Sequence, residues 1–207
     1  MPPELARLDE SAMVWSAPPA ERAGRPLLLA LHGHNGDEHQ LAIAAELLPP
    51  ELVIVTARAP FRTGSGWSWF DLDESGRGAA ADVAAQLLAW VDRQTGYSSY
   101  GVLGLSQGAA MALAMLRAEP TRFAYALQLS GFAIDTTPDA RLAAIRPPVF
   151  SAHGGLDTVI PAERATDTAR WLRENTTLTE KTYPQLGHSV APDEILDAAA
   201  FIRQQLG

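Results

Sequence analysis

The chain has 207 residues, of which 47% are hydrophobic and 19% are charged, and its formal net charge is -8. This length suits one compact domain with a sizeable core, and the composition excludes a disordered protein. The negative charge argues against nucleic acid as a partner, because a phosphate backbone is bound by clustered lysine and arginine. The chain has no cysteine, which excludes disulfides, a thiolate nucleophile and thiolate metal sites.

The first ten residues do not resemble a signal peptide, because they carry Pro2, Pro3 and Glu4 and no basic start followed by an apolar run. The longest apolar stretches, such as Leu27 to Leu31, fall far short of the ~20 residues that span a bilayer. We therefore expect a cytoplasmic protein without stable membrane insertion.

Short apolar runs alternate along the chain with segments of helical period. The runs predict strands at Met13 to Trp15, Leu27 to Leu31, Leu52 to Thr56, Tyr100 to Leu105, Ala124 to Leu129, Val149 to Ala152 and Leu178 to Tyr183. The clearest helices are expected at Ala79 to Gln94 and at Pro192 to Leu206, and Arg58 to Ser75 is expected to be an irregular loop. The alternation predicts an α/β fold with about seven mostly parallel strands and helices on both faces, in a single domain over residues 1–207.

The segment Gly104-Leu105-Ser106-Gln107-Gly108 joins an expected strand to an expected helix. A G-x-S-x-G in this context is typical of a nucleophile elbow, in which flanking glycines leave room for a sharp turn with a strained serine. The turn presents the serine hydroxyl at the sheet edge, and the first amides of the helix face any negative charge that develops beside it. Ser106 is therefore the candidate nucleophile.

A serine nucleophile requires a histidine base and an acid that orients the base, and in this arrangement they follow in the order Ser, Asp, His. Asp157 follows the expected strand Val149 to Ala152, and His188 follows the last expected strand. The alternative for Asp157 is a cap on the helix that starts near Pro161. Asp135 and Asp139 are second choices for the acid, since they follow the preceding strand.

An oxyanion hole requires two backbone donors, and we expect them from Gln107 and His34, with Asn35 as the fallback. His32 and His153 are expected to be structural histidines. The segment from His32 to His39 superficially resembles the H-x-H-x-D-H cluster of metal hydrolases, but Asp37 and His39 are out of register with it. A metal-dependent hydrolase that uses His32, His34 and His39 is therefore an alternative function, and we expect no metal site. A non-catalytic binding module with this fold is the other alternative.

Together these segments resemble the carboxylesterase, lysophospholipase and acyl-protein thioesterase family of the α/β-hydrolase superfamily. The landmarks are Leu31-His32-Gly33, Ala59-Pro60, Trp69-Phe70-Asp71, Gly104 to Gly108, His153-Gly154, Asp157 to Pro161 and Gly187-His188. The resemblance implies a serine hydrolase without a cofactor or a large lid domain, acting on small-molecule carboxylic esters or thioesters, and it is compatible with a homodimer. His34 and Ala109 depart from the family, which usually has leucine and glycine there.

Several apolar side chains are candidates for the wall of an acyl site. The candidates are Trp67, Trp69 and Phe70 in the loop of residues 58–75, Phe132 after an expected strand, and Val159 in the matched segment after Asp157. The alternative is that such aromatic residues pack as small satellite clusters.

Overall fold

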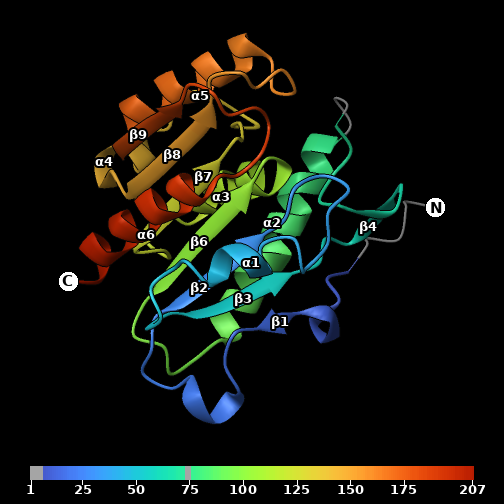
Figure 1. Ribbon diagram of the computed structural model, residues 1–207, viewed down its shortest axis with the longest axis vertical. Coiled ribbons are helices and arrows are strands. Elements are labelled where there is room, and N and C mark those ends of the chain that lie inside the picture. Colours follow the sequence, from blue (N-terminus) through green and yellow to red (C-terminus); the bar gives the residue numbers. More distant parts are fainter. Residues whose placement is uncertain (1–6, 73–75) are drawn as a thin grey trace.

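A seven-stranded sheet forms the centre of the protein in the computed structural model, which describes residues 7–72 and 76–207 (Figure 1). Its strands lie in the order β1-β3-β2-β6-β7-β8-β9, and every neighbouring pair is parallel except β1 with β3. Their bounds are β1 Val14–Trp15, β2 Leu27–Leu31, β3 Val53–Ala57, β6 Tyr100–Leu105, β7 Tyr125–Leu129, β8 Pro148–Gly154 and β9 Thr177–Tyr183. The fold class that the sequence predicts is confirmed.

Six α-helices and two short 3-10 helices connect the strands in the described part of the chain. They are η1 Glu10–Ala12, η2 Pro19–Glu21, α1 Ala42–Ala45, α2 Gly76–Arg93, α3 Gln107–Ala118, α4 Ala140–Ile145, α5 Ala162–Asn175 and α6 Pro192–Leu206. None of the helices in residues 7–72 and 76–207 is long and apolar enough to cross a membrane.

The central strands are buried on both faces, which explains their continuous apolar sequences. In β2, Leu27, Leu29 and Leu31 face one core together with side chains of α2, α3 and α5. Leu28 and Ala30 face the opposite core, which includes the stripe of α6 from Ile195 to Ile202. Successive side chains of a strand point to opposite faces, so one apolar run supports both layers of helices.

The segment of residues 58–75 is not irregular throughout, and our expectation of a plain loop is wrong for part of it. It contains the two-stranded hairpin of β4 (Phe61–Thr63) and β5 (Gly66–Ser68), whose turn includes Gly64 at φ 50°. Strands of three residues are too short to show a period in the sequence, and for this reason the pattern did not reveal them. Residues 73–75, within the same expected loop, and residues 1–6, within the N-terminal segment considered as a signal peptide, lie outside the described residues.

The parallel strands also bring distant segments together, because their carboxyl ends lie at the same edge of the sheet. The chain after β2 carries His34, the chain after β6 carries Ser106, and the chains after β8 and β9 carry Asp157 and His188. Side chains on these loops can therefore meet, as expected for open parallel sheets.

Candidate active site

Ser106 occupies a strained backbone conformation between β6 and α3, with φ 53° and ψ -114°. The residues two positions before and after it must be glycine, because the chain passes so close to itself. A Cβ atom on Gly104 would lie 2.1 Å from the carbonyl oxygen of Gly108, and one on Gly108 would lie 2.1 Å from that of Leu31. The turn has the geometry of a nucleophile elbow, and the strain is of the kind that proteins maintain at functional sites.

A row of hydrogen bonds joins the three residues that the sequence singled out. His188 Nε2 lies 2.9 Å from Ser106 Oγ, and His188 Nδ1 lies 2.8 Å from Asp157 Oδ2. With Nδ1 protonated toward the carboxylate, Nε2 is free to accept the hydroxyl proton of Ser106. The arrangement can therefore activate a serine hydroxyl as a nucleophile.

Asp157 is ionised in this site although burial opposes its charge. Burial raises the pKa of this carboxyl, but hydrogen bonds from His188 and from the backbone amides of Ile160 and Val159 outweigh it and lower the pKa below the ordinary value. Asp157 Oδ1 accepts from the two amides at 2.8 Å and 3.1 Å. It does not cap the next helix, since α5 begins after Pro161 without a side-chain cap.

The other candidate acids have different partners. Asp139 caps α4 by accepting a hydrogen bond from Leu142 N, and both Asp135 and Asp139 pair with Arg117. These contacts stabilise the region between β7 and α4, and neither aspartate contacts His188.

Of the consecutive backbone amides of Gly33, His34 and Asn35 in the loop after β2, one has no hydrogen-bond acceptor among the described residues. Gly33 N donates to Gln40 Oε1 at 2.7 Å, and Asn35 N donates to the carbonyl of Trp67 at 2.9 Å. Between them, His34 N has no acceptor among the described residues. Gln107 N, at the first position of α3, precedes the amides that helical hydrogen bonds satisfy. Of the three loop amides considered, His34 N is thus the one available to an oxyanion, and the fallback Asn35 is already occupied.

His32 has a structural role in the described site. It is buried, its Nδ1 lies 2.7 Å from Gly33 O, and its Nε2 accepts from Ala59 N at 3.0 Å. Burial lowers the pKa of His32 and keeps the ring neutral. Both ring nitrogens are therefore engaged, and the ring is not available as a metal ligand. His39 is exposed beside Glu38, and no group of three or more potential metal-ligating side chains exists in the described part of the chain.

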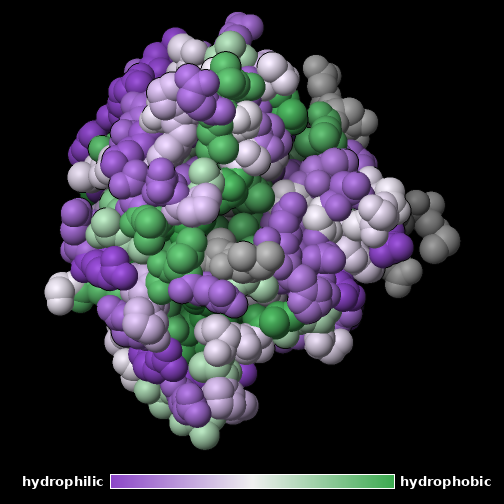
Figure 2. Space-filling model, in the orientation of Figure 1, coloured by the Kyte–Doolittle hydropathy of each residue, from purple (hydrophilic) through white to green (hydrophobic). Residues whose placement is uncertain are grey.

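A cavity of about 460 Å³ opens beside Ser106 and His188. Its apolar wall comes from the segment around α1 and from the start of α6, and an apolar band runs between these two elements on the face shown in Figure 2. The polar part of the wall includes His34 and Gln40, and the apolar side chains are Leu41, Leu47, Leu105, Val190 and Ile195. The volume is in the range of small-molecule sites.

The side chains that the sequence suggested for an acyl site do not line this cavity. Trp69, Phe70 and Phe132 are buried in the core, Trp67 packs beneath Arg58 and Arg62, and Val159 is exposed on the loop of Asp157. Ile195 belongs to an apolar stripe that the sequence shows, but the period could not reveal that this core residue also lines a cavity. Leu47 and Val190 belong to no apolar stripe that the sequence shows.

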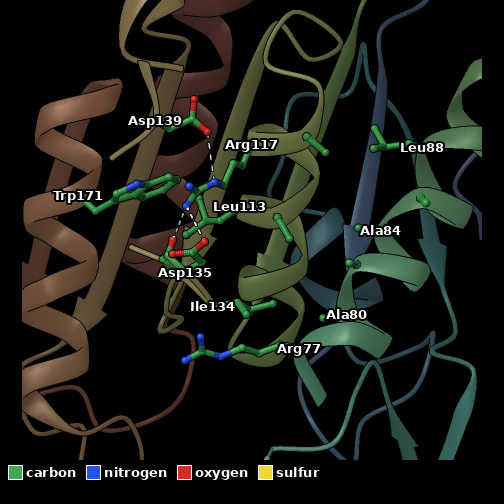
Figure 3. A pocket seen from close by; sticks show the side chains of 15 residues that line it. Arg77, Ala80, Ala84, Leu88, Leu113, Arg117, Ile134, Asp135, Asp139 and Trp171 are labelled. Carbon is green, nitrogen blue, oxygen red and sulfur yellow. Dashed lines mark hydrogen bonds and ion pairs between the residues drawn. The ribbon is translucent and has the colours of Figure 1, made fainter. Parts of the chain in front are cut away.

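A second cavity, of about 540 Å³, lies between α2, α3 and α5, away from the hydrogen-bonded row (Figure 3). Its apolar lining includes Ala80, Ala84 and Leu113, and Arg117 in the same wall is held by the two aspartates described above. This wall contains no serine, threonine or histidine, and its two aspartates are paired with Arg117.

The strand order, the elbow and the hydrogen-bonded row define the class of protein as an α/β-hydrolase. Within that class, the chain belongs to the phospholipase/carboxylesterase family, whose sequence model matches residues 17–206. It is thus a hydrolase of the carboxylesterase type.

Individual proteins and one solved esterase structure are also similar to this chain. The chain is similar to acyl-protein thioesterase 1 of Mycosarcoma maydis, with 30% identity over 66% of this chain and 68% of the relative. It is 28% identical to a probable carboxylesterase of Oryza sativa subsp. japonica over 88% of each chain. The crystal structure of esterase PE8 superposes with a TM-score of 0.78 and 26% identity, covering 96% of this chain and 99% of that one. Alignments with other fungal acyl-protein thioesterases span about half the length of those relatives.

Proposed function

We propose that the protein hydrolyses carboxylic esters through an acyl-enzyme on Ser106. The observation that carries the proposal is the continuous row from Ser106 Oγ through His188 to Asp157, with steps of 2.9 Å and 2.8 Å. Ser106 attacks the ester carbonyl while His188 takes its proton, and Asp157 stabilises the resulting imidazolium. His188 then returns the proton to the departing alcohol or thiol, and a water molecule activated by the same ring releases the acid.

The oxyanion of the tetrahedral intermediate would accept from the amides of His34 and Gln107. Both amides lack a protein acceptor in the described structure, and they flank Ser106 from two different loops. Donors that are fixed before the charge develops need no reorganisation during the reaction, and each such donor contributes about 10²–10³ to the rate.

The proposed substrates are esters or thioesters of short- to medium-chain acyl groups, with lysophospholipids in the same chemical class. The wall of Leu41, Leu47, Val190 and Ile195 supports an apolar acyl group, and the moderate volume of the cavity favours a limited chain length. The names of the relatives, acyl-protein thioesterase and carboxylesterase, agree with this chemistry.

The test combines covalent labelling with turnover. Wild type and Ser106→Ala are treated with a fluorophosphonate, analysed by intact mass, and assayed on p-nitrophenyl esters of increasing chain length with and without EDTA. We expect one adduct on wild type only, and EDTA-resistant hydrolysis that the substitution abolishes. An unlabelled, inactive wild type would favour the binding-module alternative, and loss of activity in EDTA would favour metal-dependent hydrolysis.

A further inference from the structure

The hydroxyl of Ser68 lies at the junction of the loops that form the proposed oxyanion hole. Ser68 is the last residue of β5 and is 3% exposed. Its Oγ lies 2.7 Å from the carbonyl oxygen of Phe70, 3.0 Å from Gln107 Nε2 and 3.3 Å from His34 Nδ1. A buried hydroxyl therefore contacts the side chains of both residues whose amides are the proposed oxyanion donors.

The direction of each hydrogen bond follows from the single proton of a hydroxyl group. The carbonyl oxygen of Phe70 at 2.7 Å and Gln107 Oε1 at 3.2 Å can only accept, and Ser68 donates to the nearer of the two, Phe70 O. The lone pairs of Oγ then accept from Gln107 Nε2 and from His34 Nδ1. Gln107 Oε1 in turn accepts from Trp69 N at 3.0 Å, and this fixes the orientation of the amide. His34 accordingly carries its proton on Nδ1.

These contacts connect three segments that are distant in the sequence. Gln107 begins α3, His34 follows β2, and Ser68 ends β5. The hairpin of β4 and β5 also holds the loop after β2 through the backbone, because Asn35 N donates to Trp67 O and Gly66 N donates to Asn35 Oδ1. The hairpin thus contacts the oxyanion loop at His34 and Asn35, and contacts the elbow at Gln107.

We propose that Ser68 is a positioning residue that sets the separation of the His34 and Gln107 amides, an inference that rests on the proposed function. Stabilisation of an oxyanion depends on donors fixed at the correct distance, and a small misplacement of a reacting group costs up to about 10²-fold in rate. Without the hydroxyl, His34 Nδ1 has no protein partner in the described structure, while Gln107 Nε2 keeps the Phe70 carbonyl at 2.6 Å. The loss of activity is therefore partial.

The test compares Ser68→Ala with Thr168→Val. Thr168 is also buried, and its hydroxyl accepts from Ala133 N and donates to Arg164 O, so its loss reports the general effect of removing a buried hydrogen bond. For each variant the measurements are kcat and KM on a p-nitrophenyl ester, the thermal midpoint, and inhibition by an alkyl boronic acid, whose tetrahedral serine adduct occupies the oxyanion hole.

We expect Ser68→Ala to lower kcat about 10-fold with little change in KM, and to weaken boronate inhibition by a similar factor. Thr168→Val should lower the thermal midpoint without changing kcat or boronate inhibition. The inference is overturned if Ser68→Ala loses stability like the control but keeps wild-type kcat and inhibition.

A second variant tests the inference if Ser68→Ala does not fold. It changes His34, the exposed partner in the contact between Ser68 Oγ and His34 Nδ1. His34→Ala removes the ring and leaves the backbone amide, and we expect it to lower kcat and weaken boronate inhibition in parallel, by about 3- to 10-fold. Unchanged values of both would overturn the inference. Failure of the proposed function is distinct, because wild type would then show neither hydrolysis nor labelling of Ser106.

Discussion

Asp157 and His188 are joined through only one of the two carboxylate oxygens of Asp157, and the other oxygen binds backbone amides of its own loop. Oδ2 lies 2.8 Å from His188 Nδ1, while Oδ1 accepts from the amides of Val159 and Ile160. The same side chain therefore orients the proposed base and shapes its own loop. Substitutions that spare one oxygen can separate these tasks.

Asp157→Asn should reduce kcat by about 10³–10⁴ while the protein stays folded. The asparagine carbonyl can keep the two loop amides, but its NH₂ group cannot accept the Nδ1 proton, so His188 would be held in the wrong tautomer. The measurement is kcat on a p-nitrophenyl ester together with circular dichroism. Asp135→Asn is the matched control and should keep wild-type kcat, and the reverse ranking of the two variants would refute Asp157 as the acid.

The strain at Ser106 predicts a stability difference between two inactive variants. At φ 53° and ψ -114°, glycine is accommodated without strain and alanine is not. Ser106→Gly should therefore unfold at higher urea concentration than Ser106→Ala, with a free energy of unfolding larger by about 1–3 kcal/mol.

The exposed Ser98, whose backbone φ is not positive, supplies the control pair for this comparison. There the order should reverse, because glycine loses more backbone entropy on folding and costs about 0.5–1 kcal/mol relative to alanine. Equal stabilities of the two Ser106 variants would show that the elbow stores no strain.

The cavity beside Ser106 predicts that a larger residue at Leu47 shortens the accepted acyl chain. Leu47 lines the cavity and is 39% exposed, so Leu47→Trp fills space without disrupting the core. We expect kcat/KM for p-nitrophenyl decanoate to fall at least about 10-fold relative to the butyrate ester.

Leu196→Trp is the control, because Leu196 is 52% exposed on α6 and does not line the cavity. It should leave the chain-length profile unchanged. If both variants show the wild-type profile, the acyl group does not lie against Leu47.

The buried carboxyl group of Glu194 leads us to expect that the free energy of unfolding decreases as the pH rises toward neutrality. It is fully buried near the start of α6, its Oε1 has no hydrogen-bond partner in the described structure, and burial raises its pKa to about 7 although Ala191 N donates to Oε2. The unfolded chain releases this proton near the ordinary value of 4.5, whereas the folded chain holds it to about 7. Stability is therefore highest below 4.5 for this group and falls between the two values by up to about 3 kcal/mol.

Glu194→Gln removes this dependence, because an amide carries no charge to bury and its oxygen can still accept from Ala191 N. Urea unfolding at pH 5 and pH 8 should show the variant gaining about 1–3 kcal/mol over wild type at pH 8 and much less at pH 5. Glu163→Gln, on the exposed first turn of α5, should show no such gain. An equal effect of Glu194→Gln at both pH values would contradict a raised pKa.

The sequence by itself determined the sheet, the elbow and the candidate acid and base. Apolar runs such as Leu27–Leu31 are local and continuous, glycines at 104 and 108 are required by a close approach of the chain to itself, and the order Ser106, Asp157, His188 follows from the positions of the loops. These features are visible because each depends on residues that are near one another in the chain or on the direction of parallel strands.

Only the tertiary structure decided which side chains line the cavity and what fixes the oxyanion loop. Trp69 is a large apolar residue of the kind that lines acyl pockets, but it lies in the core. Leu47 and Val190 line the cavity, although the sequence around them shows no distinguishing pattern. The contacts of Ser68 with His34 and Gln107 span 34 and 39 residues. Such contacts depend on how separate loops pack above the sheet edge, and packing between loops leaves no period in the sequence.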